Sequence, residues 1–121
     1  MDDFLTKRII GAAIEVHREV GSGLLESIYE EALCHEFDLR GIKYERQVEI
    51  DVIYKGKIIK GQRLDLIVEK EVIVELKSLS KVPEAVDAQV LSYLKATKLK
   101  RALRINFGLK TLIDGVKRYS L

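Results

Sequence analysis

Two short apolar stretches, residues 64–68 and 72–76, flank a polar connection of only three residues, and this spacing constrains the fold. So short a connection favours a β-hairpin. If paired residue numbers sum to 140, every apolar side chain of one stretch faces an apolar side chain of the other. Asp65 then lies opposite Glu75 on one face of the hairpin. A sum of 142 would set an isoleucine against a glutamate, and a two-residue loop would put the two carboxylates on opposite faces. We therefore predict the register that sums to 140.

The predicted pairing of Asp65 with Glu75 is electrostatically unfavourable by itself, because opposed Cβ atoms lie about 5 Å apart. Lys77 and Arg63 lie diagonally on the same face and supply positive charge. A divalent cation such as Mg²⁺ supplies two charges, binds carboxylate oxygens and turns water into a nucleophile. The residues thus predict a cation site at the two carboxylates, with Lys77 beside it. Alternation alone equally fits a hairpin whose charged face meets solvent.

Length and composition predict one domain over residues 1–121, because the chain is 47% hydrophobic and 33% charged. It has no apolar run near the roughly 18 residues of a membrane span. It also has no basic-then-apolar leader. We expect a cytosolic protein with no membrane partner. The single cysteine, Cys34, excludes an internal disulfide. The chain has only two histidines, and these with Cys34 give no zinc-ligand spacing.

Periodicity predicts alternating blocks of helix and strand. Helices are expected near residues 5–20 and 25–39, and residues 80–83 are expected to open a third helix with Pro83 near its first position. Strands are expected near 48–54, 58–59, 63–68, 72–77 and 102–107, with a short helix or strand over 112–119. This order describes an α/β (α+β) domain with a mixed central sheet flanked by helices. The strand that carries Glu75 should be central, because it is apolar on both faces near its loop.

The C-terminal part of the chain is basic, since residues 95–121 hold eight Lys or Arg against one acid. Five of these residues share one acid-free stretch: Lys95, Lys98, Lys100, Arg101 and Arg104. This stretch is predicted to follow a phosphate backbone. A solvated helix end explains the same charge equally well.

The order Asp65, then Glu75-x-Lys77 at a strand end, resembles the PD-(D/E)xK nuclease core, whose fold is restriction-endonuclease-like. Gly23-x-x-Glu26-x-x-Tyr29 resembles the signature of the GxxExxY family, a small branch of that superfamily. The resemblance covers nearly the whole chain, and further matching segments are 63–65, 74–77, 88–89, 93–96 and 105–108.

The resemblance implies a metal-dependent nuclease that hydrolyses nucleic acid, with DNA as the expected partner. Asp65 and Glu75 would bind Mg²⁺ or Mn²⁺ and Lys77 would be the catalytic lysine. Glu26 would be a further metal ligand, as the first-helix glutamate of the superfamily is, with Glu30 one turn later in support.

Gln89 and Tyr93 lie at helical i, i+4 spacing and resemble the QxxxY motif of RecB-like exonucleases. The resemblance implies that both support the active site. Departures from the pattern are Leu64 before Asp65 in place of proline, Val86 where many GxxExxY relatives have histidine, and Arg101-Ala102 where they have Gly-Leu. The alternative function is a non-cleaving scaffold that binds nucleic acid or a protein. The small size also allows a homodimer that grips a duplex.

Overall fold

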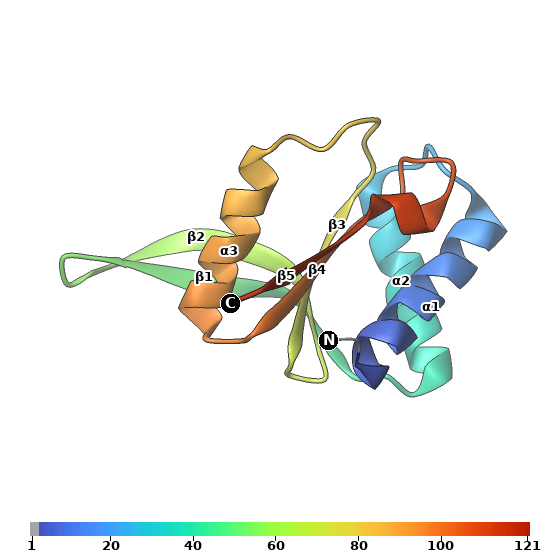
Figure 1. Cartoon of the computed structure of the whole chain (residues 1–121). Coiled ribbons are helices and arrows are strands. Elements are labelled where there is room, and N and C mark those ends of the chain that lie inside the picture. Colours follow the sequence, from blue (N-terminus) through green and yellow to red (C-terminus); the bar gives the residue numbers. More distant parts are fainter. Residues whose placement is uncertain (1–2) are drawn as a thin grey trace.

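A computed structural model describes residues 3–121 and consists of a five-stranded mixed sheet with helices on both faces (Figure 1). The elements in chain order are α1 (Phe4–Val20), α2 (Glu26–Arg40), β1 (Tyr44–Tyr54), β2 (Lys57–Val68), β3 (Val72–Lys77), α3 (Ala85–Thr97), β4 (Arg101–Asn106), the 3-10 turn η1 (Leu112–Gly115) and β5 (Val116–Ser120). Neighbours in the chain are neighbours in the sheet, and β3 with β4 is the parallel pair. The predicted mixed sheet with a central Glu75 strand is confirmed.

Both faces of β3 are covered by helices, which explains its nearly continuous apolar sequence. Val74 and Leu76 pack in the core cluster formed with α1 and α2, whereas Ile73 packs in the second cluster with α3. Figure 1 shows α3 on one side of the sheet and α1 with α2 on the other. No helix within residues 3–121 is long and apolar enough to cross a membrane.

Local sequence signals determine where α1 begins and where α2 ends. Asp3 caps α1, because its side chain accepts a hydrogen bond from the Thr6 backbone N–H at 2.8 Å. Gly41 ends α2 in the left-handed conformation with φ of 70°. The strands predicted over 58–59 and 63–68 are instead one continuous β2.

The β2–β3 hairpin has the predicted register near its turn. Val68 pairs with Val72, Ile67 with Ile73 and Leu66 with Val74. The prediction was wrong for Leu64, which packs beneath α3 in the second core cluster rather than on the Leu66 side. The regular pairing ends at Leu66. Beyond it, the backbone N–H groups of Asp65 and Leu76 donate to the side-chain carboxylates of Glu75 and Asp65 instead of to backbone carbonyls of the opposite strand. The two strands are therefore free to diverge beyond this point.

The loop after β3 is fixed by Asn106, a buried residue at the end of β4. The side-chain amide of Asn106 donates to the Leu79 carbonyl at 2.9 Å, and its Oδ1 accepts from the backbone N–H groups of Leu79 at 2.9 Å and Gly108 at 3.0 Å. This clamp holds the β3–α3 loop against the residues that follow β4.

Gly108 is predicted to be essential to this clamp, because a Cβ there would overlap the backbone of Leu79. We expect Gly108→Ala to lower the free energy of unfolding by about 1–3 kcal/mol, as overpacking does in other cores. Urea denaturation measures this change. Gly11→Ala is the control, since its Cβ would meet only the end of the Arg40 side chain at 3.4 Å. That variant should be as stable as the wild type or more stable, and equal stability of both variants would contradict the prediction.

Candidate active site

Asp65 and Glu75 lie together across the end of the β2–β3 ladder, as the register predicts. The Asp65 backbone N–H donates to Glu75 Oε1 at 2.8 Å, and the Leu76 backbone N–H donates to Asp65 Oδ2 at 2.8 Å. Each carboxylate thus accepts a hydrogen bond from the opposite strand. Backbone groups therefore hold both side chains in one place.

Burial of this pair disfavours its negative charge. Glu75 is only 4% exposed. Burial, with the nearby charge of Asp65, raises the pKa of Glu75 to about 8. Burial also raises the pKa of Asp65, although the hydrogen bond from Leu76 opposes this shift. Two clustered carboxylates with raised pKa values are hard oxygen donors whose charge is incompletely compensated. They fit a divalent cation such as Mg²⁺ or Mn²⁺.

Lys77 and Glu26 lie within electrostatic range of the pair. Lys77 ends β3 and is half-buried, and its ammonium opposes the rise in the pKa values of Glu26, Asp65 and Glu75. Glu26 is the first residue of α2 and is exposed, and partial desolvation of its carboxylate raises its pKa, with a further increase from Asp65 and Glu30. Within residues 3–121, no three His, Cys, Asp or Glu side chains are assembled as a metal-binding group. The preformed part of the site is the carboxylate pair, and Glu26 as a further ligand stays a prediction.

Tyr29 fixes the loop that precedes Glu26. Its hydroxyl donates to the Gly21 carbonyl at 2.6 Å and accepts from the Leu24 backbone N–H at 3.2 Å. The buried ring stacks on Phe107 with centroids 4.4 Å apart. The tyrosine of the Gly-x-x-Glu-x-x-Tyr segment thus has a structural role.

The loop fixed by Tyr29 also contacts the end of β3, where Ser78 Oγ donates to the Leu24 carbonyl at 2.6 Å. An open groove of about 580 Å³ lies between this loop and the β3–α3 loop, with Glu26 in its wall. The start of α2 is therefore held beside the end of β3.

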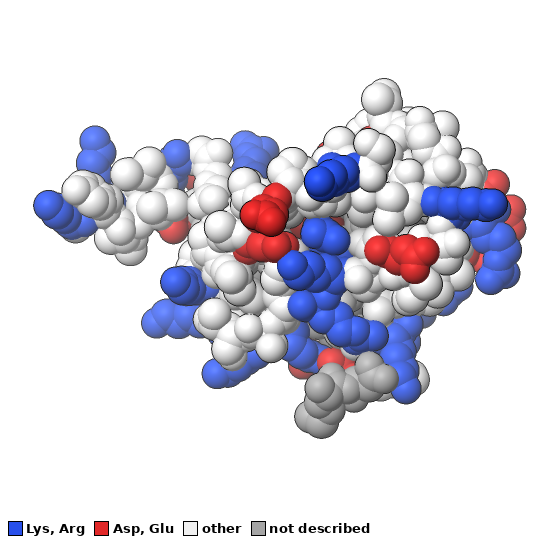
Figure 2. Space-filling view, turned by 45° about the horizontal axis from the view of Figure 1, so that its top comes forward, with Lys and Arg blue, Asp and Glu red and all other residues white. Residues whose placement is uncertain are grey.

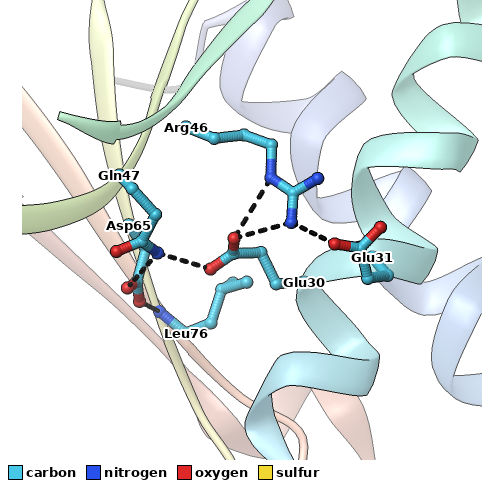
Figure 3. A network of polar contacts seen from close by, with 6 residues as sticks. All are labelled: Glu30, Glu31, Arg46, Gln47, Asp65 and Leu76. Carbon is cyan, nitrogen blue, oxygen red and sulfur yellow. Dashed lines mark hydrogen bonds and ion pairs between the residues drawn. The ribbon is translucent and has the colours of Figure 1, made fainter.

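Glu30 lies in a polar network that reaches Asp65 (Figure 3). Glu30 Oε2 accepts from Arg46 Nε at 3.1 Å and from Arg46 Nη2 at 2.9 Å, and Glu31 also contacts this guanidinium. Gln47 Nε2 donates to Glu30 Oε1 at 2.8 Å and lies 3.4 Å from Asp65 Oδ1. Sequence reasoning missed both Arg46 and Gln47, because polar residues in an exposed strand carry no distinguishing signal.

Tyr93 and Arg63 meet on the α3 side of the site. The Tyr93 hydroxyl donates to the Arg63 carbonyl at 3.0 Å, while the Arg63 side chain is exposed. Burial, with the charges of Glu75 and Asp65, raises the pKa of Tyr93 to about 12. Tyr93 therefore lies near the carboxylates. Gln89, one turn earlier on α3, is exposed, and its supporting role stays a prediction.

The basic stretch is split by the fold: Arg104 is the β4 register partner of Glu75, whereas Arg101 lies away from the carboxylates. Because β4 is parallel to β3 with Arg101 beside Val72 and Asn106 beside Lys77, Arg101 lies about 16 Å along the sheet from Lys77. Arg101 contacts Asp3 and Glu71, and half-buried Arg104 lies 3.8 Å from Asp87. Exposed members are Lys95, Lys98 and Lys100. Figure 2 shows that the basic side chains on its face are interspersed with acidic ones.

The sequence matches a family of known proteins. No curated protein matches the chain. One solved structure that it resembles, the crystal structure of SSO0001, is 18% identical with a TM-score of 0.44, over 97% of this chain and 76% of the other. The family model described as the PD-(D/E)XK nuclease superfamily matches residues 3–119, which include strands β1 to β4, all but the last residue of β5, and the carboxylate pair. The chain therefore belongs to the PD-(D/E)XK nuclease superfamily.

Proposed function

We propose that this protein is a metal-dependent nuclease of the GxxExxY branch that hydrolyses phosphodiester bonds, with DNA as its substrate. The observation that carries the proposal is the carboxylate pair, in which half-buried Asp65 and buried Glu75 accept hydrogen bonds from each other's strands beside Lys77. A scaffold that never binds a cation has no use for this arrangement, because burial of two adjacent carboxylates is costly.

Phosphodiester hydrolysis requires on the order of 20 kcal/mol of transition-state stabilisation, most of it electrostatic. Asp65 and Glu75, with Glu26, would hold one or two Mg²⁺ or Mn²⁺ ions. When bound, such an ion polarises the phosphate and lowers the pKa of the attacking water. Lys77 orients that water or donates hydrogen bonds to the phosphate oxygens as their charge increases.

Other residues of the chain hold the substrate and the site in this scheme. Tyr93 is buried against β2 and supports the strand that carries Asp65. Gln89 contacts the nucleic acid or the lysine from α3. Exposed Lys95, Lys98 and Lys100 attract the phosphate backbone. Arg101 and Arg104 would contribute less, because both already contact acidic side chains.

The test is cleavage of end-labelled single-stranded DNA, duplex DNA and RNA by the purified protein. We expect cleavage of DNA with Mg²⁺ or Mn²⁺, and none after EDTA removes the metal, because uncompensated carboxylates repel the phosphate. Binding without cleavage under every divalent cation would instead indicate a catalytically silent scaffold. Equal cleavage in EDTA would contradict the metal-dependent mechanism.

A further inference from the structure

We propose that Gln47 is a positioning residue that fixes the carboxylate of Asp65, and that Glu30 and Arg46 act on the metal site through it. The inference rests on the proposed function, because it assigns Asp65 as a metal ligand. It adds to that function a supporting network on β1 and α2, which lie outside the β2–β3 hairpin that carries Asp65, Glu75 and Lys77.

The hydrogen bonds define the direction of this support. Asp65 Oδ2 is fixed by the Leu76 backbone N–H at 2.8 Å, and Gln47 Nε2 approaches Asp65 Oδ1 at 3.4 Å. The two oxygens of one carboxylate thus face donors from different strands, which restricts rotation of the group. Gln47 is itself held, since the same nitrogen donates to Glu30 at 2.8 Å (Figure 3).

The backbone of Gln47 is specialised for this contact. Its φ of 49° lies in the left-handed region, which costs a non-glycine residue on the order of 1 kcal/mol. Regular β1–β2 pairs lie on either side, Arg46 with Leu66 and Val48 with Leu64. Gln47 therefore interrupts the β1–β2 ladder opposite Asp65. Its side-chain amide lies between the carboxylates of Glu30 and Asp65. Strained backbone beside predicted catalytic groups is typical of positions kept for function.

The Arg46 guanidinium compensates the charge of Glu30, which separates its role from that of a metal ligand. Oε2 accepts from two nitrogens of Arg46, and Oε1 accepts from Gln47. Asp65, by contrast, receives one backbone hydrogen bond at 2.8 Å and only a long contact from Gln47 at 3.4 Å. Glu30 instead anchors the amide, so its effect on metal binding should disappear when Gln47 is removed.

The test is calorimetric titration with Mn²⁺ alone, on wild type, Gln47→Ala, Glu30→Gln and the double variant. Gln47→Ala should weaken Mn²⁺ binding about tenfold, as removal of residues that orient metal ligands does elsewhere. Glu30→Gln should weaken it comparably, and the double variant should bind no more weakly than Gln47→Ala. Glu36→Gln, on the same helix and paired with Arg40 at 2.6 Å, is the control and should leave the affinity unchanged.

A glycine variant separates the amide from the backbone strain. Gln47→Gly relieves the left-handed residue and should be at least as stable as the wild type, yet it should bind Mn²⁺ as weakly as Gln47→Ala. Unchanged affinity in Gln47→Gly would overturn the inference. Additive effects of Gln47→Ala and Glu30→Gln would also overturn it, because they would make Glu30 an independent ligand.

Failure of the proposed function has a different signature, namely no Mn²⁺ binding by the wild type. In that case the contacts of Gln47 are tested on the metal-free protein, by measuring the chemical shift of its side-chain amide in a ¹H–¹⁵N NMR spectrum. That signal should shift in Glu30→Gln and in Asp65→Asn. An unshifted signal in both variants would overturn the inference.

Discussion

Lys77→Met is expected to lower the rate of metal-dependent cleavage about 10²–10³-fold, the usual cost of removing a donor that stabilises transition-state charge. Methionine keeps the unbranched apolar stem of lysine and removes only the ammonium. Single-turnover cleavage at saturating protein measures the chemical step without interference from product release.

Lys77→Met should also change the protonation of the nearby carboxylates. The ammonium of Lys77 opposes the rise in the pKa values of Glu26, Asp65 and Glu75. Without it, these groups hold their protons to a higher pH, and protons compete more strongly with the metal. The Mn²⁺ requirement of the variant should therefore continue to fall up to a higher pH than that of the wild type.

Lys70→Met is the matched control, because Lys70 is exposed in the turn at the other end of β3. It should leave the cleavage rate within about twofold, since exposed substitutions rarely have larger effects. Equal cleavage rates for Lys77→Met and the wild type would show that Lys77 is not a catalytic residue.

The hairpin and its carboxylate pair could be predicted from the sequence because their causes are local. The spacing of apolar residues and the length of the 69–71 connection decide the register near the turn. Both signals act within about a dozen residues. The prediction failed at Leu64, where the Asp65 and Glu75 side chains accept hydrogen bonds of the ladder and the regular pairing stops.

The support around the pair depends on tertiary contacts that periodicity does not report. The position of Gln47 requires a left-handed backbone and the approach of Glu30 from α2. Likewise, the basic stretch looks continuous in the sequence, yet the parallel β3–β4 pairing carries Arg101 to the far end of the sheet. Charge clusters in sequence become charged surfaces only when topology brings them to one face.

Glu75→Gln is expected to stabilise the metal-free protein at pH 8.5 by on the order of 3 kcal/mol, with much less effect at pH 5. The folded-state pKa of Glu75 is raised by burial from 4.5 to about 8. Between these values the folded chain keeps a proton that the unfolded chain has lost. The free energy of unfolding of the wild type should therefore fall as the pH rises from about 4.5 to about 8, and the loss should be complete above that range.

The amide introduced by Glu75→Gln removes this titration and can still accept the hydrogen bond that Glu75 Oε1 receives from the Asp65 backbone at 2.8 Å. Urea denaturation at pH 5 and pH 8.5, both in EDTA, measures the difference. Glu45→Gln, an exposed position on β1, is the control and should change the free energy of unfolding by less than about 0.5 kcal/mol at either pH.

Metal should reduce this difference in stability at pH 8.5. Ligand binding to the folded state adds about 2.7 kcal/mol when the metal is at a hundred times its dissociation constant. Wild type should gain this stability from Mn²⁺, whereas Glu75→Gln, which lacks one anionic ligand, should gain far less and show no cleavage. The charge that destabilises the metal-free fold is then the charge that binds the metal. An equal loss of stability in Glu75→Gln at both pH values, with no response of the wild type to Mn²⁺, would show that Glu75 is a buried structural residue and not a metal ligand.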